Sequence, residues 1–157
     1  DEELTFFAEA NVGIAVASPK GLMVPVIHDA GSKSLGEIAA ARADIVSRAR
    51  EGAITRADIT GGTFTISNLG MMGITRFDAI LNVPQAAILA VGATISRVTG
   101  TADNPQWRPI AELTLTCDHR ALDGATGAKF IGALKKHLEA PLSVLAPSTA
   151  AASLVSA

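Results

Sequence analysis

Residues Asp118 to Gly124 hold the side chains of this sequence that are best suited to acid–base chemistry. His119 is followed four residues later by Asp123. Histidine is the side chain that can accept and return a proton near neutral pH without an unusual environment. The alternative is an ordinary surface histidine, with Asp123 serving only as the N-cap of the next helix. The elements and motifs around the two residues bear on this choice.

These residues stand at a predicted corner between a strand and a helix. Before them, Glu112–Thr116 alternates polar and apolar residues, as a half-buried strand does. After them, apolar residues recur at three- and four-residue steps, which predicts a helix over Asp123–Glu139. Its apolar stripe consists of Ala125, Ala128, Ile131, Leu134 and Leu138. Such a corner holds polar side chains on rigid elements at the edge of a sheet, where a substrate can reach them.

The composition predicts one folded domain. The chain has 157 residues, of which 48% are hydrophobic and 18% are charged, and this excludes a disordered chain. The net charge of -2 gives no basic surface, so we expect no nucleic-acid partner. Cys117 is the single cysteine, which excludes an intrachain disulfide, and we expect it to be a small core residue. The spacing of the three histidines predicts no metal site, and no apolar run predicts a membrane span.

The rest of the chain alternates predicted strands with one further helix. Ser34 and Glu37 form a capping-box signature, and Gly52 is the predicted end of the helix that follows. One face of this helix is predicted to carry Leu35, Ile38, Arg42, Ile45 and Ala49. The predicted strands are Leu4–Ala17, Leu22–Ile27, Thr63–Ser67, Ala86–Val98 and Trp107–Cys117, with a loop at Gly70–Gly73 and a hairpin turn at Thr99–Pro105. Strands mixed with two helices in this order predict an α/β or α+β sandwich, with helices packed on one mixed sheet.

Four stretches, in the same order along the chain, resemble one family. Asp118–Gly124 is similar to the active-site motif of the dihydrolipoamide acyltransferases. Asn11–Ile27, Gly61–Gly70 and Asn82–Gly92 resemble other segments of the same catalytic domain. These enzymes form the core of the 2-oxoacid dehydrogenase complexes and are fold relatives of chloramphenicol acetyltransferase. The resemblance implies an α/β fold of the chloramphenicol acetyltransferase type, a two-layer sandwich with helices packed on a mixed β-sheet.

The resemblance also implies the roles of individual residues. His119 would be the base that takes the proton of a thiol, and the hydroxyl of Ser67 would stabilise the tetrahedral oxyanion. Asp123 matches the position that orders the surroundings of the histidine, with Arg120 as a structural ion partner. Asn68, Leu69 and Gly70 are candidates for binding substrate. For Thr63, Thr65, Thr114 and Thr116, an exposed sheet face is favoured over a role in lining the substrate channel.

The reaction that the resemblance implies moves an acyl group between a dihydrolipoyl-lysine and coenzyme A. The sequence favours acetyl, as in a pyruvate dehydrogenase complex, and leaves succinyl and branched-chain groups open. Coenzyme A would be a cosubstrate, the lipoyl group would be carried by a separate domain, and no metal is expected. Two alternatives stay open: a free-standing acetyltransferase of the chloramphenicol type, and an inactive, truncated scaffold fragment.

The family further implies an assembly and a location. The site would lie between the subunits of a homotrimer, which can build a larger cage and bind the other subunits of the complex. The location would be the cytoplasm, or the mitochondrial matrix in a eukaryote. Residues 1–146 are expected to be a catalytic domain that lacks its N-terminal part, and residues 147–157 a flexible tail rich in serine and alanine. The sequence departs from the family at His28, where a basic residue is usual, and at Val83, where proline is common.

Overall fold

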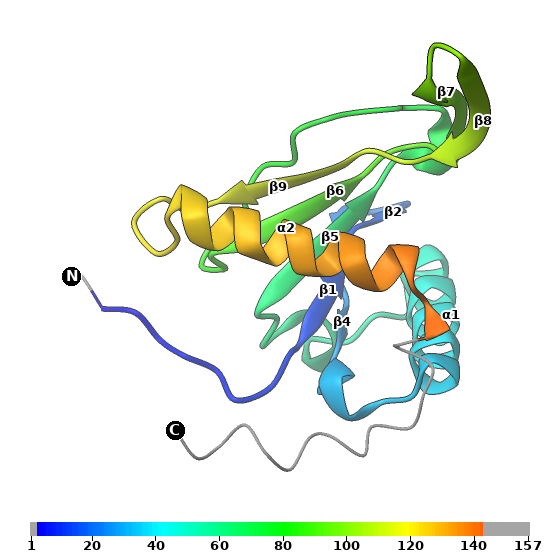
Figure 1. Cartoon of the computed structure of the whole chain (residues 1–157). Coiled ribbons are helices and arrows are strands. Elements are labelled where there is room, and N and C mark those ends of the chain that lie inside the picture. Colours follow the sequence, from blue (N-terminus) through cyan, green and yellow to red (C-terminus); the bar gives the residue numbers. More distant parts are fainter. Residues whose placement is uncertain (1–2, 143–157) are drawn as a thin grey trace. The chain divides into compact units, whose positions relative to one another are not determined.

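The computed structural model describes residues 3–142 and contains one mixed sheet, two smaller antiparallel pairs and two long helices (Figure 1). The strands are β1 (Val12–Ile14), β2 (Val16–Ser18), β3 (Gly21–Met23), β4 (Val26–Ile27), β5 (Phe64–Asn68), β6 (Ala87–Val91), β7 (Ile95–Thr101), β8 (Asn104–Ile110) and β9 (Leu113–Cys117). The helices are α1 (Leu35–Glu51) and α2 (Gly124–Glu139), with short 3-10 turns η1 (Ala30–Ser32), η2 (Ala57–Ile59) and η3 (Gly70–Met72). This is the mixed α/β class that the sequence predicts.

The main sheet has five strands in the order β4-β1-β5-β6-β9. Strands β1, β5 and β6 are parallel to one another, and the edge strands β4 and β9 are antiparallel to their neighbours. The core is centred on β6, where Ala87, Ile88, Leu89 and Ala90 are all buried. A strand that is covered on both faces has an unbroken run of apolar residues in its sequence, and such a run occurs here. Strand β6 is therefore the rigid centre between β5 and β9.

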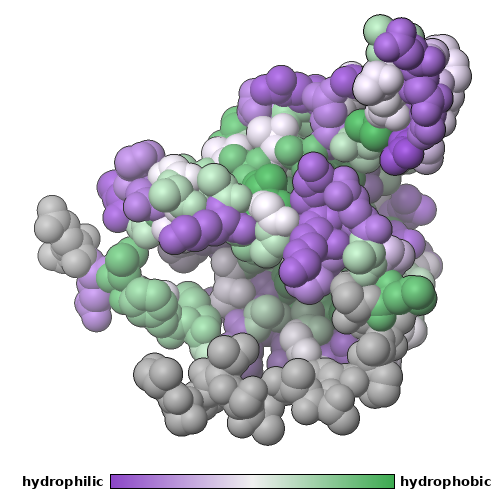
Figure 2. Space-filling model, viewed as in Figure 1, coloured by the Kyte–Doolittle hydropathy of each residue, from purple (hydrophilic) through white to green (hydrophobic). Residues whose placement is uncertain are grey.

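The first two predicted strands are each broken in the structure. The segment that precedes β1 forms no strand, and it exposes Phe6 and Phe7; Figure 2 shows hydrophobic residues in green along it. Strand β1 ends at Ile14, where the Ala15 amide makes its last hydrogen bond to β5, to the carbonyl of Ile66 at 2.9 Å, and the next residue, Val16, pairs with Met23 of β3. The return strand is interrupted at Pro25, which has no N–H to offer to a ladder. Strands β2 and β3 consequently form a separate pair.

The predicted strands Ala86–Val98 and Trp107–Cys117 are also divided, and the two breaks lie opposite each other. Residues 92–94 separate β6 from β7, and residues 111–112 separate β8 from β9. The two interruptions are joined, because the amide of Gly92 donates to the carbonyl of Glu112 at 2.9 Å. The predicted turn at Thr99–Pro105 is tighter than expected, since β7 continues to Thr101 and β8 begins at Asn104.

Helix α1 begins and ends where the sequence predicts. The Ser34 amide donates to Glu37 Oε2 at 2.8 Å and the Glu37 amide donates back to Ser34 Oγ at 3.3 Å, which completes the capping box. Gly52 closes the helix in the left-handed conformation with φ 73°. Only the C-terminal half of the predicted stripe is buried, at Ile45 and Ala49, where the helix packs on β2 and β4.

The chain divides into two compact units, residues 1–123 and residues 124–157. The described part of the second unit contains α2, which begins one residue after the predicted start and ends at the predicted Glu139. Within residues 3–142, no helix is long and apolar enough to cross a membrane. The predicted tail, residues 147–157, lies outside the described residues.

Candidate functional site

The loop after β9 holds the predicted catalytic histidine in a turn organised by Asp118. The amide of Asp118 donates to the carbonyl of Ala86 at 2.8 Å, which ties the loop to the start of β6. Its own carbonyl accepts from the amides of Ala121 and Leu122, both at 2.9 Å. His119 lies in this turn and is exposed, and Asp123, also exposed, directly precedes α2. The turn therefore presents His119 to solvent on a fixed backbone.

Arg120 is an ion partner, as predicted, but its partner is Asp118. The guanidinium donates to both carboxylate oxygens, with Nη2 at 2.6 Å from Oδ2 and Nε at 3.0 Å from Oδ1. The Arg120 amide donates to the same Oδ1 at 3.0 Å. These hydrogen bonds lower the pKa of Asp118 to about 2, and those from the Arg120 side chain have a larger effect than the one from its amide. Asp118 thus remains ionised throughout the physiological range, and it binds Arg120 across His119, which lies between them.

Ser67 lies near the end of β5, followed by a turn that fixes its neighbours. The hydroxyl of Ser67 is half-buried and makes no hydrogen bond to another described residue. The Asn68 side chain accepts a hydrogen bond from the Gly70 amide at 2.8 Å, and the Leu69 amide donates to the carbonyl of Val91 at 3.2 Å. The predicted loop after them contains the short helix η3. The candidate substrate-binding residues therefore form one tight turn beside Ser67.

This turn is held by close contacts between backbones. A Cβ atom on Gly70 would lie 2.8 Å from the carbonyl oxygen of Gly92. A Cβ atom on Gly92 would lie 2.7 Å from the carbonyl carbon of Thr75 and would overlap its oxygen. Real Cβ atoms do not approach backbone this closely, so both positions require glycine.

The register of the sheet places Ser67 and His119 at opposite ends of it. Strands β5, β6 and β9 lie side by side (Figure 1). Ser67 is level with Ala90 of β6, and Ala90 is level with Thr114 of β9. Asp118, at the far end of β9, is four residues beyond Thr114, a distance of about 13 Å along a strand. Two strand spacings add about 10 Å sideways. The structure therefore does not bring the Ser67 hydroxyl and the His119 ring together within one chain.

Thr65 of β5 and Thr63 just before it do not form an exposed face, and that interpretation is wrong for Thr65, which is buried. Thr65 is fully buried and donates to Gln85 Oε1 at 2.5 Å, and the Asn82 amide group donates to Thr65 Oγ1 at 3.4 Å. Thr63 is half-buried and bonded to the backbone of Asn11. Hydrogen bonds of this kind satisfy a buried hydroxyl, and they account for both side chains within the fold. Thr114 and Thr116 on β9 are half-buried.

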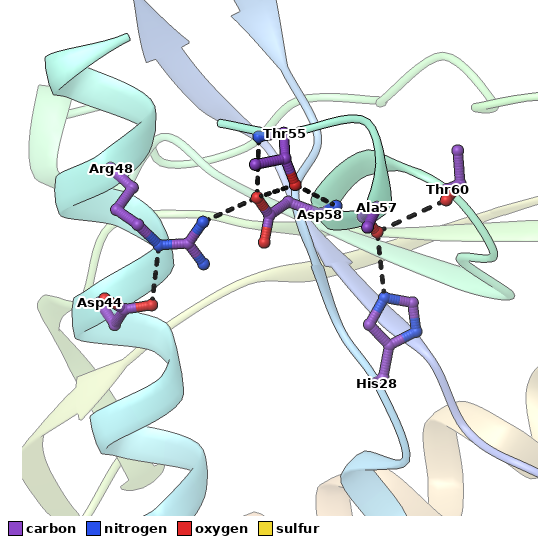
Figure 3. A network of polar contacts seen from close by, with 7 residues as sticks. All are labelled: His28, Asp44, Arg48, Thr55, Ala57, Asp58 and Thr60. Carbon is purple, nitrogen blue, oxygen red and sulfur yellow. Dashed lines mark hydrogen bonds and ion pairs between the residues drawn. The ribbon is translucent and has the colours of Figure 1, made fainter. Parts of the chain in front are cut away.

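The structure also shows the surroundings of Cys117 and His28. Cys117 is half-buried rather than in the core, and burial raises the pKa of its thiol. His28 is exposed, with Nε2 3.4 Å from the carbonyl oxygen of Ala57 (Figure 3). Among residues 3–142 there is no group of three or more histidine, cysteine, aspartate or glutamate side chains that could hold a metal ion.

A pocket of about 220 Å³ lies beside His28, and its charged lining is structural. Arg48 of α1 donates to Asp44 at 2.9 Å and to Asp58 at 2.7 Å, and Thr55 donates to the same oxygen of Asp58 (Figure 3). These hydrogen bonds lower the pKa of Asp58, and the bond from Arg48 has the largest effect. The network fastens α1 to η2, and the pocket contains none of the predicted catalytic residues.

The sequence of the whole described region matches one protein family. Residues 1–146 match the model of the 2-oxoacid dehydrogenases acyltransferase catalytic domain. The chain belongs to this family.

Proteins of known function resemble this acyltransferase chain over most of its length. It is 37% identical over 145 residues to the dihydrolipoyllysine-residue acetyltransferase component of the pyruvate dehydrogenase complex of Rickettsia bellii. It is 43% identical over 142 residues to the mitochondrial counterpart of Schizosaccharomyces pombe. The match covers 92% and 88% of this chain but only 35% and 29% of those proteins.

Solved structures of acyltransferase cores resemble it as well. The dihydrolipoamide acetyltransferase of Azotobacter vinelandii, studied for the roles of a serine, a histidine and an asparagine in its catalytic mechanism, superposes with a TM-score of 0.86 at 36% identity. A truncated catalytic core of the 2-oxoacid dehydrogenase complex of Thermoplasma acidophilum gives 0.76 at 40% identity. The matches cover 91% and 87% of this chain, and 59% and 60% of those chains.

The role of Asp118 in this turn is not predicted from the sequence. The motif includes Asp118, but the predicted roles are those of Asp123, which orders the surroundings of His119, and of Arg120, a structural ion partner. An aspartate two residues before an arginine, at the end of a strand, is itself a signal, because its side chain can accept from the backbone two residues on. That local rule would have identified Asp118 as the residue that organises the turn.

Proposed function

We propose that this chain is the catalytic part of a dihydrolipoyllysine-residue acetyltransferase, a transferase that moves an acetyl group between a dihydrolipoyl-lysine and coenzyme A. Membership of the acyltransferase family supports the reaction class. The names of the relatives from Rickettsia bellii and Schizosaccharomyces pombe support acetyl as the group and the pyruvate dehydrogenase complex as the setting. Residues 1–146 would form the catalytic domain.

The observation that carries this proposal is the spacing of three residues. In the Azotobacter vinelandii enzyme, the serine precedes the histidine by 52 residues and the asparagine follows the histidine by 4. Ser67 precedes His119 by the same 52 residues, and Asp123 follows His119 by the same 4. At 36% identity, equal spacing over this distance supports the same three roles for Ser67, His119 and Asp123.

His119 would act as the base. An alkyl thiol has a pKa of about 8.5, so only a few per cent of it is thiolate at pH 7. His119 takes the proton of the coenzyme A thiol as the sulfur attacks the thioester carbonyl of the acetylated lipoyl group. A carbon–sulfur bond forms, and the carbonyl oxygen becomes an oxyanion. As the bond to the dihydrolipoyl sulfur breaks, the imidazolium of His119 returns the proton to that sulfur, and no group on the enzyme is acylated.

Ser67 would donate a hydrogen bond to the oxyanion. The hydroxyl makes no hydrogen bond to another described residue, and it stands on a strand next to the buried β6. A donor that is fixed before charge develops stabilises the transition state without further reorganisation. Asp123 would order the surroundings of His119. Asn68, Leu69 and Gly70, which form the turn beside Ser67, would contact the coenzyme A or lipoyl arm.

The distance between Ser67 and His119 supports a site shared by two copies of the chain. Both side chains must lie about 3 Å from the reacting thioester. Since the register separates them by far more, the Ser67 end of one copy would face the His119 end of another. A homotrimer is the assembly we propose, and a larger cage built from trimers is supported by the similarity to the cubic core of the pyruvate dehydrogenase multienzyme complex. The partners would be a lipoyl domain and the other subunits of such a complex.

The location follows from the complex. We propose the cytoplasm in a bacterium and the mitochondrial matrix in a eukaryote, since the matched relatives include bacterial proteins and proteins named as mitochondrial.

The test is transfer of acyl groups from coenzyme A thioesters to free dihydrolipoamide, measured with the His119→Ala and Ser67→Ala variants. We expect kcat to fall by at least about 10²-fold for His119→Ala and about 10²- to 10³-fold for Ser67→Ala, with little change in KM. Each variant should retain its assembly. Mixing the two inactive variants should restore activity, because a chain of the Ser67→Ala variant still offers His119 to a neighbour that retains Ser67.

The same assay separates the alternatives. Acetyl-coenzyme A should be preferred over succinyl- and branched-chain thioesters, and dihydrolipoamide over chloramphenicol as acceptor. Wild-type turnover with His119→Ala, or no transfer by the wild-type protein to any thiol, would overturn the proposed function.

A further inference from the structure

Two of the three methionines of this chain expose their thioethers next to each other. Met71 and Met72 are consecutive in the sequence, and they are 77% and 73% exposed. The third methionine, Met23, is half-buried on β3. An exposed apolar side chain is common on a protein surface, but a thioether differs from a hydrocarbon because a mild oxidant attacks its sulfur. Exposure therefore makes Met71 and Met72 chemically accessible in a way that Met23 is not.

The backbone that carries the two methionines is held in the short helix η3. The Met72 amide donates to the carbonyl of Leu69 at 3.0 Å, and the Gly73 amide donates to the carbonyl of Gly70 at 3.1 Å. Gly73 ends the helix in the left-handed conformation with φ 79°. At its other end, Gly70 is packed directly on the backbone of Gly92. An ordered turn thus keeps both methionines at the surface.

Helix η3 also adjoins the candidate substrate-binding turn. Met71 is four residues after Ser67, and four residues span at most about 14 Å of chain. Residues 68–70, the candidates for contact with the coenzyme A or lipoyl arm, lie between the two. The Leu69 carbonyl accepts the hydrogen bond of the Met72 amide, so the two turns are joined. A change in the polarity of the methionine side chains is therefore a change beside the proposed path of the substrate.

The only cysteine of the chain is a poorer target for an oxidant. Cys117 is half-buried at the end of β9, and burial raises the pKa of its thiol. The thiolate is the form that peroxide oxidises, so little of the reactive form is present at neutral pH. Methionine has no proton to lose, and its oxidation follows exposure. Among the sulfur atoms of this chain, those of Met71 and Met72 are consequently the most accessible to a peroxide.

We propose that Met71 and Met72 form an oxidation-sensitive site, at which a peroxide converts the two thioethers to sulfoxides and so weakens acyl transfer. In each reaction one oxygen of hydrogen peroxide is transferred to the sulfur, and the O–O bond breaks as the S–O bond forms. The sulfur is oxidised by two electrons, and the peroxide is reduced to water. A sulfoxide is polar where the thioether is apolar, so the surface beside residues 68–70 receives an acyl or lipoyl arm less well. This effect on acyl transfer rests on the proposed function.

The first test locates the oxidation. The full chain with Cys117→Ala, which removes the thiol, is treated with dilute hydrogen peroxide, and the sulfoxides are followed by mass spectrometry of its peptides. We expect Met71 and Met72 to be oxidised at least about 10-fold faster than Met23, because exposure sets the rate. Equal rates at the three methionines would overturn the site.

The second test measures acyl transfer by the same protein before and after treatment. We expect KM for dihydrolipoamide to rise about 10-fold, with kcat within about twofold of its starting value. Methionine sulfoxide reductase should restore KM, because it reduces the sulfoxide to the thioether. A variant that also carries Met71→Leu and Met72→Leu should have the starting activity and keep it after treatment. The matched control, Met23→Leu, should lose activity as its parent does.

The remaining outcomes separate this inference from the proposed function. A loss of activity that persists in the variant with both leucines, or full oxidation of Met71 and Met72 with an unchanged KM, would overturn the inference. A lowered melting temperature of the oxidised protein would assign the loss to unfolding and would also overturn it. An untreated wild-type protein that transfers no acyl group would reject the proposed function, whereas the relative oxidation rates would still decide whether Met71 and Met72 are the sensitive site.

Discussion

The two ends of the five-stranded sheet hold their candidate catalytic residues by different physical means. At the Ser67 end, Gly70 and Gly92 let backbones approach more closely than any side chain would allow. At the His119 end, an ion pair and backbone hydrogen bonds centred on Asp118 hold the turn. The Arg120 side chain of this pair is 87% exposed.

The difference suits the two proposed roles. An oxyanion donor is effective when it is aimed before charge develops, and close packing gives that rigidity under all solution conditions. An exposed ion pair is weaker and responds to salt and pH. We therefore expect substitutions of the closely packed glycines at the Ser67 end to act on folding, and substitutions around Asp118 to act on the position of His119.

The largest effect should come from Gly92→Ala. The added Cβ would overlap the carbonyl oxygen of Thr75, and the backbone on both sides must move to accept it. We expect the free energy of unfolding to fall by about 3 kcal/mol, the upper range for overpacking. Thermal and urea denaturation measure it. Acyl transfer should fall as well, since the turn beside Ser67 depends on this contact.

Gly36→Ala is the matched control. Gly36 lies in the first turn of α1, and a Cβ there would meet no atom within 4 Å. Alanine in a helix is favoured over glycine, so this variant should be as stable as the wild type or up to about 1 kcal/mol more stable. Equal stability of the Gly92→Ala and Gly36→Ala variants would show that packing does not hold the Ser67 end.

The next effect concerns the turn at the His119 end, tested by Asp118→Ala and Asp118→Asn. Alanine removes both the ion pair with Arg120 and the acceptor for the Arg120 amide, whereas asparagine keeps an acceptor oxygen. A displacement of about 1 Å at a catalytic group can cost up to about 10²-fold in rate. We expect kcat to fall about 10-fold for alanine and less for asparagine, with KM unchanged. Equal loss in the two variants would assign the effect to charge alone.

The same pair of variants predicts a pH dependence of stability. The pKa of Asp118 is lowered in the folded protein from 3.8 to about 2, so the folded state favours the ionised carboxylate. Its contribution to stability is therefore present above pH 3.8 and is lost as the pH falls toward 2. The difference in melting temperature between wild type and Asp118→Ala should be constant from about pH 7 to about 5 and shrink below about pH 4. A difference that grows as the pH falls would contradict the assigned ion pair.

The sequence predicts local features of this fold well. The capping box of Ser34 and Glu37 and the closing Gly52 are set by residues within a few positions of one another. The breaks at Ala15 and Gly92 are not predicted, because the first lies where the chain leaves β5 to pair with Met23 and the second lies where the backbone of Thr75 approaches Gly92. Apolar runs identify strands but carry no information about where a long-range contact interrupts them.

In the candidate site, too, local features can be predicted from the sequence and long-range contacts cannot. The motif suggests which residue types take part, and Asp118 is recoverable from a local turn rule. The burial of Thr65 cannot be predicted from a local rule, since Thr65 is bonded to Gln85 and Asn82 in a different segment. The separation of Ser67 from His119 follows only from the register of β5, β6 and β9. Register is a pairing between distant segments, which a single strand sequence does not determine.

The smallest effect is expected at Asp123. Four residues after its histidine, the Azotobacter vinelandii enzyme has an asparagine, whereas this chain has an aspartate. If the residue orders the surroundings of His119 by hydrogen bonding, the amide oxygen of asparagine can replace a carboxylate oxygen as acceptor. We expect Asp123→Asn to keep kcat within about threefold of the wild type, a change below about 0.7 kcal/mol in the activation free energy.

Asp123→Ala provides the contrast for this last prediction. It removes the acceptor, so its kcat should fall further than that of Asp123→Asn, and the ratio of the two rates measures the hydrogen bond. The pH profile of kcat distinguishes the possible roles of the charge. A carboxylate that stabilises the imidazolium of His119 would shift the profile to lower pH when it is replaced by a neutral amide. A large loss in Asp123→Asn together with such a shift would mean that this chain uses the charge, where its Azotobacter relative works with a neutral side chain.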